Sequence, residues 1–124
     1  MNDKKSIIQE KSFAFAVRII KLYQYLTDTK KEYVLSKQLL RSGTAIGALA
    51  REAQNAESKK DFIHKLGIAQ KECDETIYWI ELLKETEFIN NKEFESINHE
   101  AIELLKMLKS AVITSKQKLI TQNS

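Results

Sequence analysis

Few residues of this chain could bind a metal ion through nitrogen or sulfur, because its 124 residues include only two histidines and one cysteine. Four-helix bundles that hold two metal ions use Glu from two helices and a Glu-x-x-His spacing on the other two. Asp61 and His64 have that three-residue spacing, but Ser96 stands three residues before His99, so the second half of the motif is missing. Asp61 is better explained as a helix cap. The sequence therefore predicts no metal site.

Cys73 could act as a nucleophile only where its surroundings stabilise the thiolate. Its neighbours Glu72, Asp74 and Glu75 are negatively charged and disfavour a thiolate, and it falls within an apolar helical stripe. We interpret it as a small buried hydrophobic residue. Glu52 could be a buried carboxylate, although an ion pair with a neighbouring basic residue is the simpler expectation. Because the chain has no phosphate-binding loop and no nucleophile elbow, we expect neither an enzyme nor a cofactor.

Charge is distributed unevenly along the chain, which has a net charge of +3. Residues 1–60 carry twelve Lys and Arg against six Asp and Glu, residues 61–105 carry four against eleven, and residues 106–124 carry four Lys and no acid. A basic face could bind the phosphates of a nucleic acid. The same charges could instead pair with the acidic segment of this or a neighbouring copy. The candidate phosphate contacts are Arg18, Lys37, Arg41 and Arg51.

Composition predicts a single domain over residues 1–124. The chain is 43% hydrophobic and 30% charged. Its hydrophobic fraction is too high, and its net charge too small, for a disordered protein. A lone cysteine excludes an intramolecular disulfide and fits a reducing compartment. No apolar run approaches the ~18 residues that a membrane span needs. We therefore expect a soluble, cytoplasmic protein with no membrane partner.

Helices must position all of these residues. Proline is absent and all three glycines lie between residues 43 and 67, which argues against strands and tight turns. Apolar residues recur at three- and four-residue steps, and no alternation of period two persists. Short connections favour antiparallel neighbours, so the predicted fold is all-α, an antiparallel up-down-up-down four-helix bundle. The expected helices span about residues 6–27, 29 or 36 to 56, 59–86 and 91–115, followed by a frayed tail over residues 116–124.

Each predicted helix start carries a possible capping pair. An N-cap side chain accepts a hydrogen bond from the backbone N–H two or three residues later, so the spacing predicts where a helix begins. The second helix could also begin at Ser36. The pairs are Ser6 and Gln9, Thr29 and Glu32, Ser58 and Asp61, and Asn90 and Glu93.

The helix predicted over residues 6–27 has two apolar stripes on roughly opposite faces. One consists of Phe13, Val17 and Ile20, with Ala16 beside it. Because a helix of a monomeric four-helix bundle needs one apolar stripe, two stripes indicate burial on both sides and predict a homo-oligomer. We expect the subunit interface on the second stripe and on a tryptophan that lies off the main stripe of its helix. The predicted interface residues are Ile8, Phe15, Ile19, Leu22, Leu26 and Trp79.

Gly43 and Gly47 lie four residues apart and so share one face of the second predicted helix. Glycine inside a helix costs up to ~1 kcal/mol relative to alanine, so the pair needs a reason. A crowded helix crossing is the simpler one, because glycine lets another backbone approach closely. A ligand or phosphate near that backbone is the alternative.

Six segments within residues 13–83 carry a family pattern, and the most specific part joins the second and third predicted helices. They read FAFAVRI (13–19), QLLRSGTAIGA (38–48), REA (51–53), SKKDFIHKL (58–66), AQKE (69–72) and ETIYWIELL (75–83). This pattern resembles the four-helix-bundle family of 23S ribosomal RNA intervening-sequence proteins. Members commonly have Asn where this chain has Leu49.

The resemblance implies a compact antiparallel bundle that assembles as a homo-oligomer, commonly a homopentamer. The family is named for reading frames inside intervening sequences of bacterial 23S rRNA genes, and some members are labelled ribosomal proteins. A related branch comprises accessory proteins of diversity-generating retroelements, which are pentameric basic barrels that bind nucleic acid and reverse transcriptase. No biochemical activity is established for most members.

Two functional hypotheses remain. In the first, the protein is a non-enzymatic, homo-oligomeric accessory protein associated with ribosomal RNA, and the four basic residues named above contact phosphates of structured RNA or DNA. In the alternative, it is a protein-interaction scaffold with no nucleic-acid role. A continuous basic face would favour the first hypothesis, whereas pairing of the basic side chains with the acidic residues between 72 and 81 would favour the second.

Overall fold

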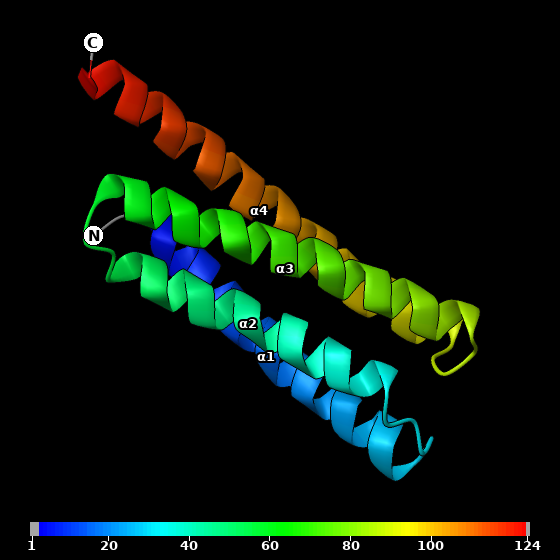
Figure 1. Ribbon diagram of the computed structural model, residues 1–124. Helices are drawn as coiled ribbons and strands as arrows, with labels where there is room; N and C mark the ends of the chain where they lie inside the picture. The colour runs from blue at the N-terminus through cyan, green and yellow to red at the C-terminus, as the bar shows by residue number, and fades with distance from the viewer. Residues whose placement is uncertain (1–2, 124) are drawn as a thin grey trace.

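The computed structural model describes the backbone of residues 3–123 and the side chains of residues 7–121. The described chain forms four helices, α1 (Asp3–Asp28), α2 (Leu35–Gln54), α3 (Lys59–Glu85) and α4 (Asn91–Asn123). The α1–α2 and α3–α4 connections lie at one end of the molecule, and the α2–α3 connection lies at the other (Figure 1). Consecutive helices therefore run in opposite directions, and the predicted all-α four-helix bundle is confirmed. Met1, Asn2 and Ser124 lie outside the described residues.

α3 and α4 begin where local capping predicts. Ser58 Oγ accepts a hydrogen bond from the backbone N–H of Asp61 at 3.0 Å. At the start of α4, the Glu93 N–H donates to Asn90 Oδ1 at 2.8 Å and the Asn90 N–H donates to Glu93 Oε1 at 3.2 Å. This reciprocal pair is a complete capping box. At the start of α3 the box is incomplete. The Asp61 carboxylate accepts a hydrogen bond from the backbone N–H of Glu57 and not from that of the N-cap residue, Ser58.

A buried carboxylate starts α2. The N-cap residue, Val34, has no side-chain cap, and Glu32 accepts hydrogen bonds from the backbone N–H groups of Val34, Leu35 and Ser36 at 3.1, 2.9 and 2.7 Å. Burial alone would raise the pKa of Glu32, but these hydrogen bonds outweigh it and hold the pKa below its ordinary value of 4.5. Glu32 thus caps α2 instead of pairing with Thr29, and the predicted start near Ser36 is the correct one.

Two helix ends differ from the predictions. α1 begins at Asp3, so the predicted cap, Ser6, lies inside the helix. α4 continues to Asn123, past the predicted end near Ser115, and the segment expected to fray is helical as far as it is described. No Gly or Pro follows Gly67 in the chain, so the sequence beyond Ser115 contains no strong signal that ends a helix.

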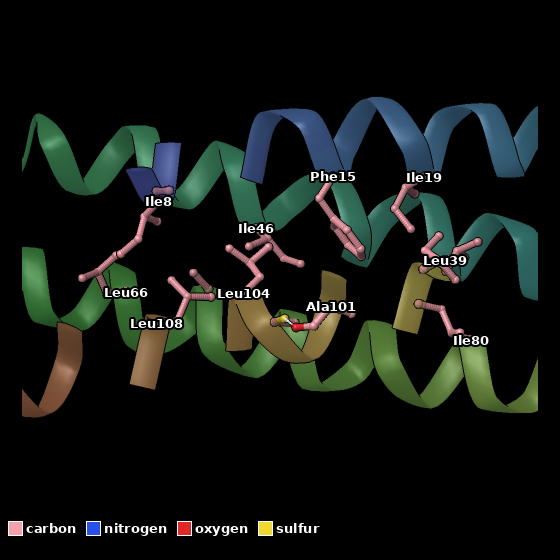
Figure 2. Close-up of a cluster of buried hydrophobic side chains, with 14 of the residues drawn as sticks. Ile8, Phe15, Ile19, Leu39, Ile46, Leu66, Ile80, Ala101, Leu104 and Leu108 are labelled. Carbon is pink, nitrogen blue, oxygen red and sulfur yellow. Dashed lines mark hydrogen bonds between the residues drawn. The ribbon is translucent and has the colours of Figure 1, made fainter. Parts of the chain in front are cut away.

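The core runs along the bundle and takes side chains from all four helices (Figure 2). Ile19 of α1, Leu39 of α2 and Ile80 of α3 are fully buried there. The thiol of Cys73 donates a hydrogen bond to the carbonyl oxygen of Ala101 at 3.3 Å, which joins α3 to α4. Of the neighbouring pairs, α1 and α4 contact each other least. Over the described residues, no helix has the length and apolar character needed to cross a membrane.

Gly43 and Gly47 let α1 and α2 approach closely. A Cβ atom on Gly43 would lie 2.8 Å from two side-chain carbons of Ile19, and one on Gly47 would lie 3.3 Å from the backbone oxygen of Ser12. The third glycine, Gly67 in α3, has no such neighbour within 4 Å. The pair therefore serves a helix crossing inside one chain, which confirms the simpler of the two interpretations.

Candidate interaction surface

The inner stripe of α1 belongs to the core of the chain. Ile8, Phe15, Ile19 and Leu26 are buried there, and Leu22 packs against them. The prediction that this stripe forms the subunit interface is therefore wrong, because side chains already buried in one chain leave no surface for a second copy. The physical reason is that the bundle needs one long apolar stripe from α1, and this one extends over most of the helix.

The outer stripe of α1, defined by Phe13, Val17 and Ile20, is the one left on the surface. These side chains are 63%, 39% and 40% exposed, respectively. The sequence therefore identified both stripes but assigned them to the wrong sides. Their lengths could have separated them, because the outer stripe covers only residues 13–20 whereas the inner one covers residues 8–26.

A groove lies beside the outer stripe, between α1 and α2. It has a volume of about 1290 Å³ and is lined by Phe13 and Ala16 of α1 and by Gly47 and Ala48 of α2. The small residues Ala16, Gly47 and Ala48 leave room beside Phe13 for an inserted helix or peptide. We call this hollow the α1–α2 groove. Its charged lining residues are Glu10, Arg51, Glu52, Glu57, Asp61 and Lys65.

Arg41 lies in an acidic cluster between α2 and α3. Its guanidinium forms ion pairs with Glu72, at 3.3 Å, and with Glu75. Trp79, which was predicted at the interface, is half-buried in the same cluster, where its indole N–H donates to Glu75 Oε2 at 3.0 Å. One guanidinium beside two carboxylates leaves a net negative charge, which opposes the approach of a phosphate.

Arg18 is also paired within the chain. Its guanidinium forms an ion pair with Glu100 at 3.0 Å and donates to Ser96 Oγ at 2.7 Å, so it links α1 to α4. An exposed pair of this kind contributes only ~0–1 kcal/mol to stability. Arg18 therefore has partners within the chain, but its ion pair with Glu100 is weak.

Lys37 and Arg51 are exposed and form no ion pair among the described side chains. Their spacing puts them within about 40° of each other around α2 and about 21 Å apart along it. The four candidate phosphate contacts thus divide into two paired arginines and two unpaired cations. They do not form one continuous basic face.

The C-terminal half of α4 is a second exposed basic segment, whose charge the sequence analysis counted but whose lysines it did not include among the candidate phosphate contacts. No Asp or Glu follows Glu103. Glu103 itself pairs with Lys11 at 2.8 Å, and this hydrogen bond raises the pKa of Lys11 and lowers that of Glu103. Among the described side chains, four lysines beyond it are exposed without an ion pair: Lys106, Lys109, Lys116 and Lys118.

Of the residues considered for catalytic chemistry, Cys73 is buried in the core and Glu52 is paired with a neighbouring side chain. Burial raises the pKa of the Cys73 thiol to about 12, and Asp74 adds to the effect, so the interpretation of Cys73 as a buried hydrophobic residue is confirmed. Glu52 is exposed and pairs with Lys65 at 3.2 Å, which was the simpler expectation. Within the described part of the chain, no three His, Cys, Asp or Glu side chains are grouped as metal ligands would be.

Fold and surface together define a small four-helix-bundle protein with an exposed apolar stripe beside an open groove. The chain belongs to the 23S rRNA-intervening sequence protein family, whose model matches residues 4–110. This match confirms the resemblance found in the sequence and extends it to most of the chain.

A solved structure is similar over nearly its whole length. It is the crystal structure of a protein of unknown function from the S23 ribosomal protein family of Bacteroides thetaiotaomicron VPI-5482. The two chains are 52% identical, with a TM-score of 0.87, over 88% of this chain and 97% of that one. No curated protein matches the chain.

Proposed function

We propose that this protein is a non-enzymatic, homo-oligomeric interaction scaffold that assembles through the outer stripe of α1. The observation that carries the proposal is the exposure of Phe13, Val17 and Ile20 as one apolar strip beside the α1–α2 groove. Scattered apolar residues are ordinary on a protein surface, but a contiguous strip is typical of an interface. The homopentameric state that the family resemblance implies is part of the same proposal.

The pairing of Arg41 favours a scaffold over a phosphate-binding surface. Its partners, Glu72 and Glu75, belong to the acidic segment whose pairing with the basic side chains was the expected mark of a scaffold. A phosphate at this position would meet two carboxylates for each guanidinium.

Light scattering coupled to size-exclusion chromatography at micromolar concentration tests the scaffold. We expect the unmodified protein to be an oligomer and Phe13→Asp to shift it toward the monomer with unchanged helical circular dichroism, since Phe13 is exposed in the single chain. Tyr78→Asp is the matched control, because Tyr78 is an exposed aromatic residue on α3. A monomeric unmodified protein would overturn the proposal, and equal dissociation by both variants would overturn the role of the outer stripe.

A second candidate function is association with ribosomal RNA. The unpaired cations Lys37 and Arg51 on one side of α2 favour it, together with membership of a family described by 23S rRNA. A ring of subunits would repeat these two charges, and repeated phosphate contacts strengthen binding through avidity. A cytoplasmic location belongs to this candidate, because bacterial ribosomal RNA is cytoplasmic.

Fluorescence anisotropy with structured RNA and duplex DNA at increasing salt tests this candidate. Lys37→Ala and Arg51→Ala are expected to weaken binding and to reduce the slope of log affinity against log salt by roughly 1 each. Lys92→Ala is the control, since it removes the same charge from the acidic segment, residues 61–105. Absence of salt-sensitive binding to either nucleic acid would contradict the candidate and leave the scaffold standing.

A further inference from the structure

α4 extends beyond the other helices and carries apolar residues on its exposed side. Its C-terminal part, residues 109–123, separates from α3 at the end of the bundle where α1 begins (Figure 1), and we call it the α4 extension. Ile113 and Ile120 are 57% and 69% exposed there. They lie seven residues apart and so occupy the same side of the helix, about 10 Å apart along it. Because they share one side of the helix, both isoleucines could contact the same partner surface.

Lysines flank this apolar pair. Lys109 and Lys116 lie on the same side of α4 as the two isoleucines, judged from their spacing at 100° per residue. Both are exposed and have no ion pair among the described side chains. The segment from residue 104 onward contains no acid. Its partner should therefore offer an apolar surface bordered by carboxylates.

The α1–α2 groove offers such a surface. Phe13 borders it, and the small residues Ala16, Gly47 and Ala48 line it. Its wall runs from residue 44 of α2 to residue 55, just after the helix, about 16 Å, which exceeds the separation of the two isoleucines. Four of its lining residues are carboxylates, namely Glu10, Glu52, Glu57 and Asp61. Arg51 and Lys65 also line it, and Lys65 already pairs with Glu52.

The extension does not cover the groove of its own chain. Over the described residues, α4 packs against α3 and more lightly against α1, and its backbone does not approach that of α2. The groove needs a helix that lies against both α1 and α2. A second copy of the chain can supply that helix, because the extension projects away from its own bundle.

We propose that the α4 extension of one copy packs into the α1–α2 groove of a neighbouring copy. Ile113 and Ile120 contact the apolar border formed by Phe13, and the flanking lysines lie near the groove carboxylates. The proposal rests on the self-association proposed above and names the segment that covers Phe13 of the outer stripe. Donor and acceptor surfaces differ, so the contact is heterologous and repeats from copy to copy, which builds a ring if the rotation closes and a filament if it does not.

Cysteine cross-linking in the full chain tests this contact. The native Cys73 is fully buried and does not interfere with thiol reagents in the folded protein. The double variant Phe13→Cys with Ile113→Cys, treated with a short bismaleimide, is expected to give a ladder of linked chains on a denaturing gel. Each single variant is expected to stay unlinked. Phe13→Cys with Ile102→Cys is the matched control, because Ile102 is an exposed isoleucine on α4 that lies outside the extension.

The outcomes separate this contact from the proposed function. Linked dimers from Phe13→Cys alone would show that two α1 helices pair with each other, which overturns the α4 contact but keeps the scaffold. An oligomer whose 13/113 variant links no more than the 13/102 control would also overturn it. A protein that is monomeric before any substitution would remove both proposals.

A substitution in the extension gives an independent measurement. Ile113→Asp changes an exposed residue, so the monomer is expected to keep its helical content. If Ile113 is an interface anchor, the dissociation constant of the oligomer rises about tenfold or more. An unchanged dissociation constant would contradict the contact.

Discussion

Glu32 illustrates how one side chain can start a helix from outside it. Its carboxylate accepts hydrogen bonds from three backbone N–H groups at the N-terminus of α2, where those groups have no partner inside the helix. The positive end of the helix dipole favours a negative charge at this place. Glu32 is nearly buried, so these hydrogen bonds replace the water that the carboxylate loses on folding.

Replacing Glu32 with glutamine should lower the free energy of unfolding by about 1–2 kcal/mol at neutral pH. The folded-state pKa is lowered, so the charged carboxylate stabilises the fold above its ordinary pKa of 4.5, and this contribution is lost as the pH falls through the lowered value. The difference between the unmodified protein and Glu32→Gln should therefore shrink on acidification. Urea unfolding at neutral and acidic pH measures it.

Glu81→Gln is the control for this prediction, because Glu81 is exposed near the C-terminal end of α3. Its effect should stay within about 0.5 kcal/mol at either pH. A pH-independent loss of stability in Glu32→Gln would contradict the role given to the charge.

Helix starts could be predicted from sequence where the capping side chain is of a type preferred at an N-cap. Ser58 and Asn90 act on residues three positions ahead, so their type and spacing were sufficient. Glu32 also acts only two to four residues ahead, but glutamate is not a preferred N-cap residue, and its spacing from Thr29 assigned it to a different capping pair.

At the level of helices, α1 and α2 approach so closely that a side chain would overlap α1 at Gly43 and would be tightly packed against it at Gly47. Gly43 packs directly on Ile19, and Gly47 faces the backbone of Ser12. Each glycine lowers the intrinsic helix propensity of α2. The crossing recovers that cost through close packing of the two helices.

Gly43→Ala should destabilise the protein by about 1–2 kcal/mol, because the new methyl group overlaps Ile19 and the overpacking outweighs the gain in helix propensity. Gly67→Ala is the matched control in α3. It has open space around it and should stabilise the protein by about 0.5–1 kcal/mol. Urea unfolding measures both, and a stabilising Gly43→Ala would contradict the close crossing.

The two stripes of α1 mark the limit of periodicity as a predictor. A period of 3.6 residues identifies apolar faces but does not say which one the chain itself buries. Phe15 and Ile19 were therefore assigned to an interface that they cannot reach. The length of α4 escaped prediction for a different reason, because a polar segment without Gly or Pro can continue as helix.

In the whole molecule, the end of α4 and the α1–α2 groove carry charges of opposite sign. The part of α4 beyond Glu103 has lysines and no acid, whereas four of the residues that line the groove are carboxylates. The lysine-rich segment of one copy is therefore attracted to the groove of another. Because these two surfaces differ, the charges favour head-to-tail contacts over symmetric ones.

If assembly stabilises the fold, the melting temperature should rise with protein concentration, because the oligomer binds only folded chains. Phe13→Asp should remove most of this dependence while leaving the melting temperature at low concentration nearly unchanged. Differential scanning calorimetry over a hundredfold range of about micromolar to submillimolar concentration tests it. A melting temperature that is constant over this range in the unmodified protein would contradict assembly.

Because Cys73 is buried, the reactivity of its thiol reports how often α3 and α4 separate in the folded protein. The thiol lies at the contact of α3 with α4 and is reached by a reagent only after those helices separate. Because its raised pKa also suppresses the reactive thiolate, the rate of alkylation in the native protein follows the rare open state and gives a free energy for that fluctuation. A chain that seldom opens will keep this sulfur reduced and unmodified throughout its folded lifetime.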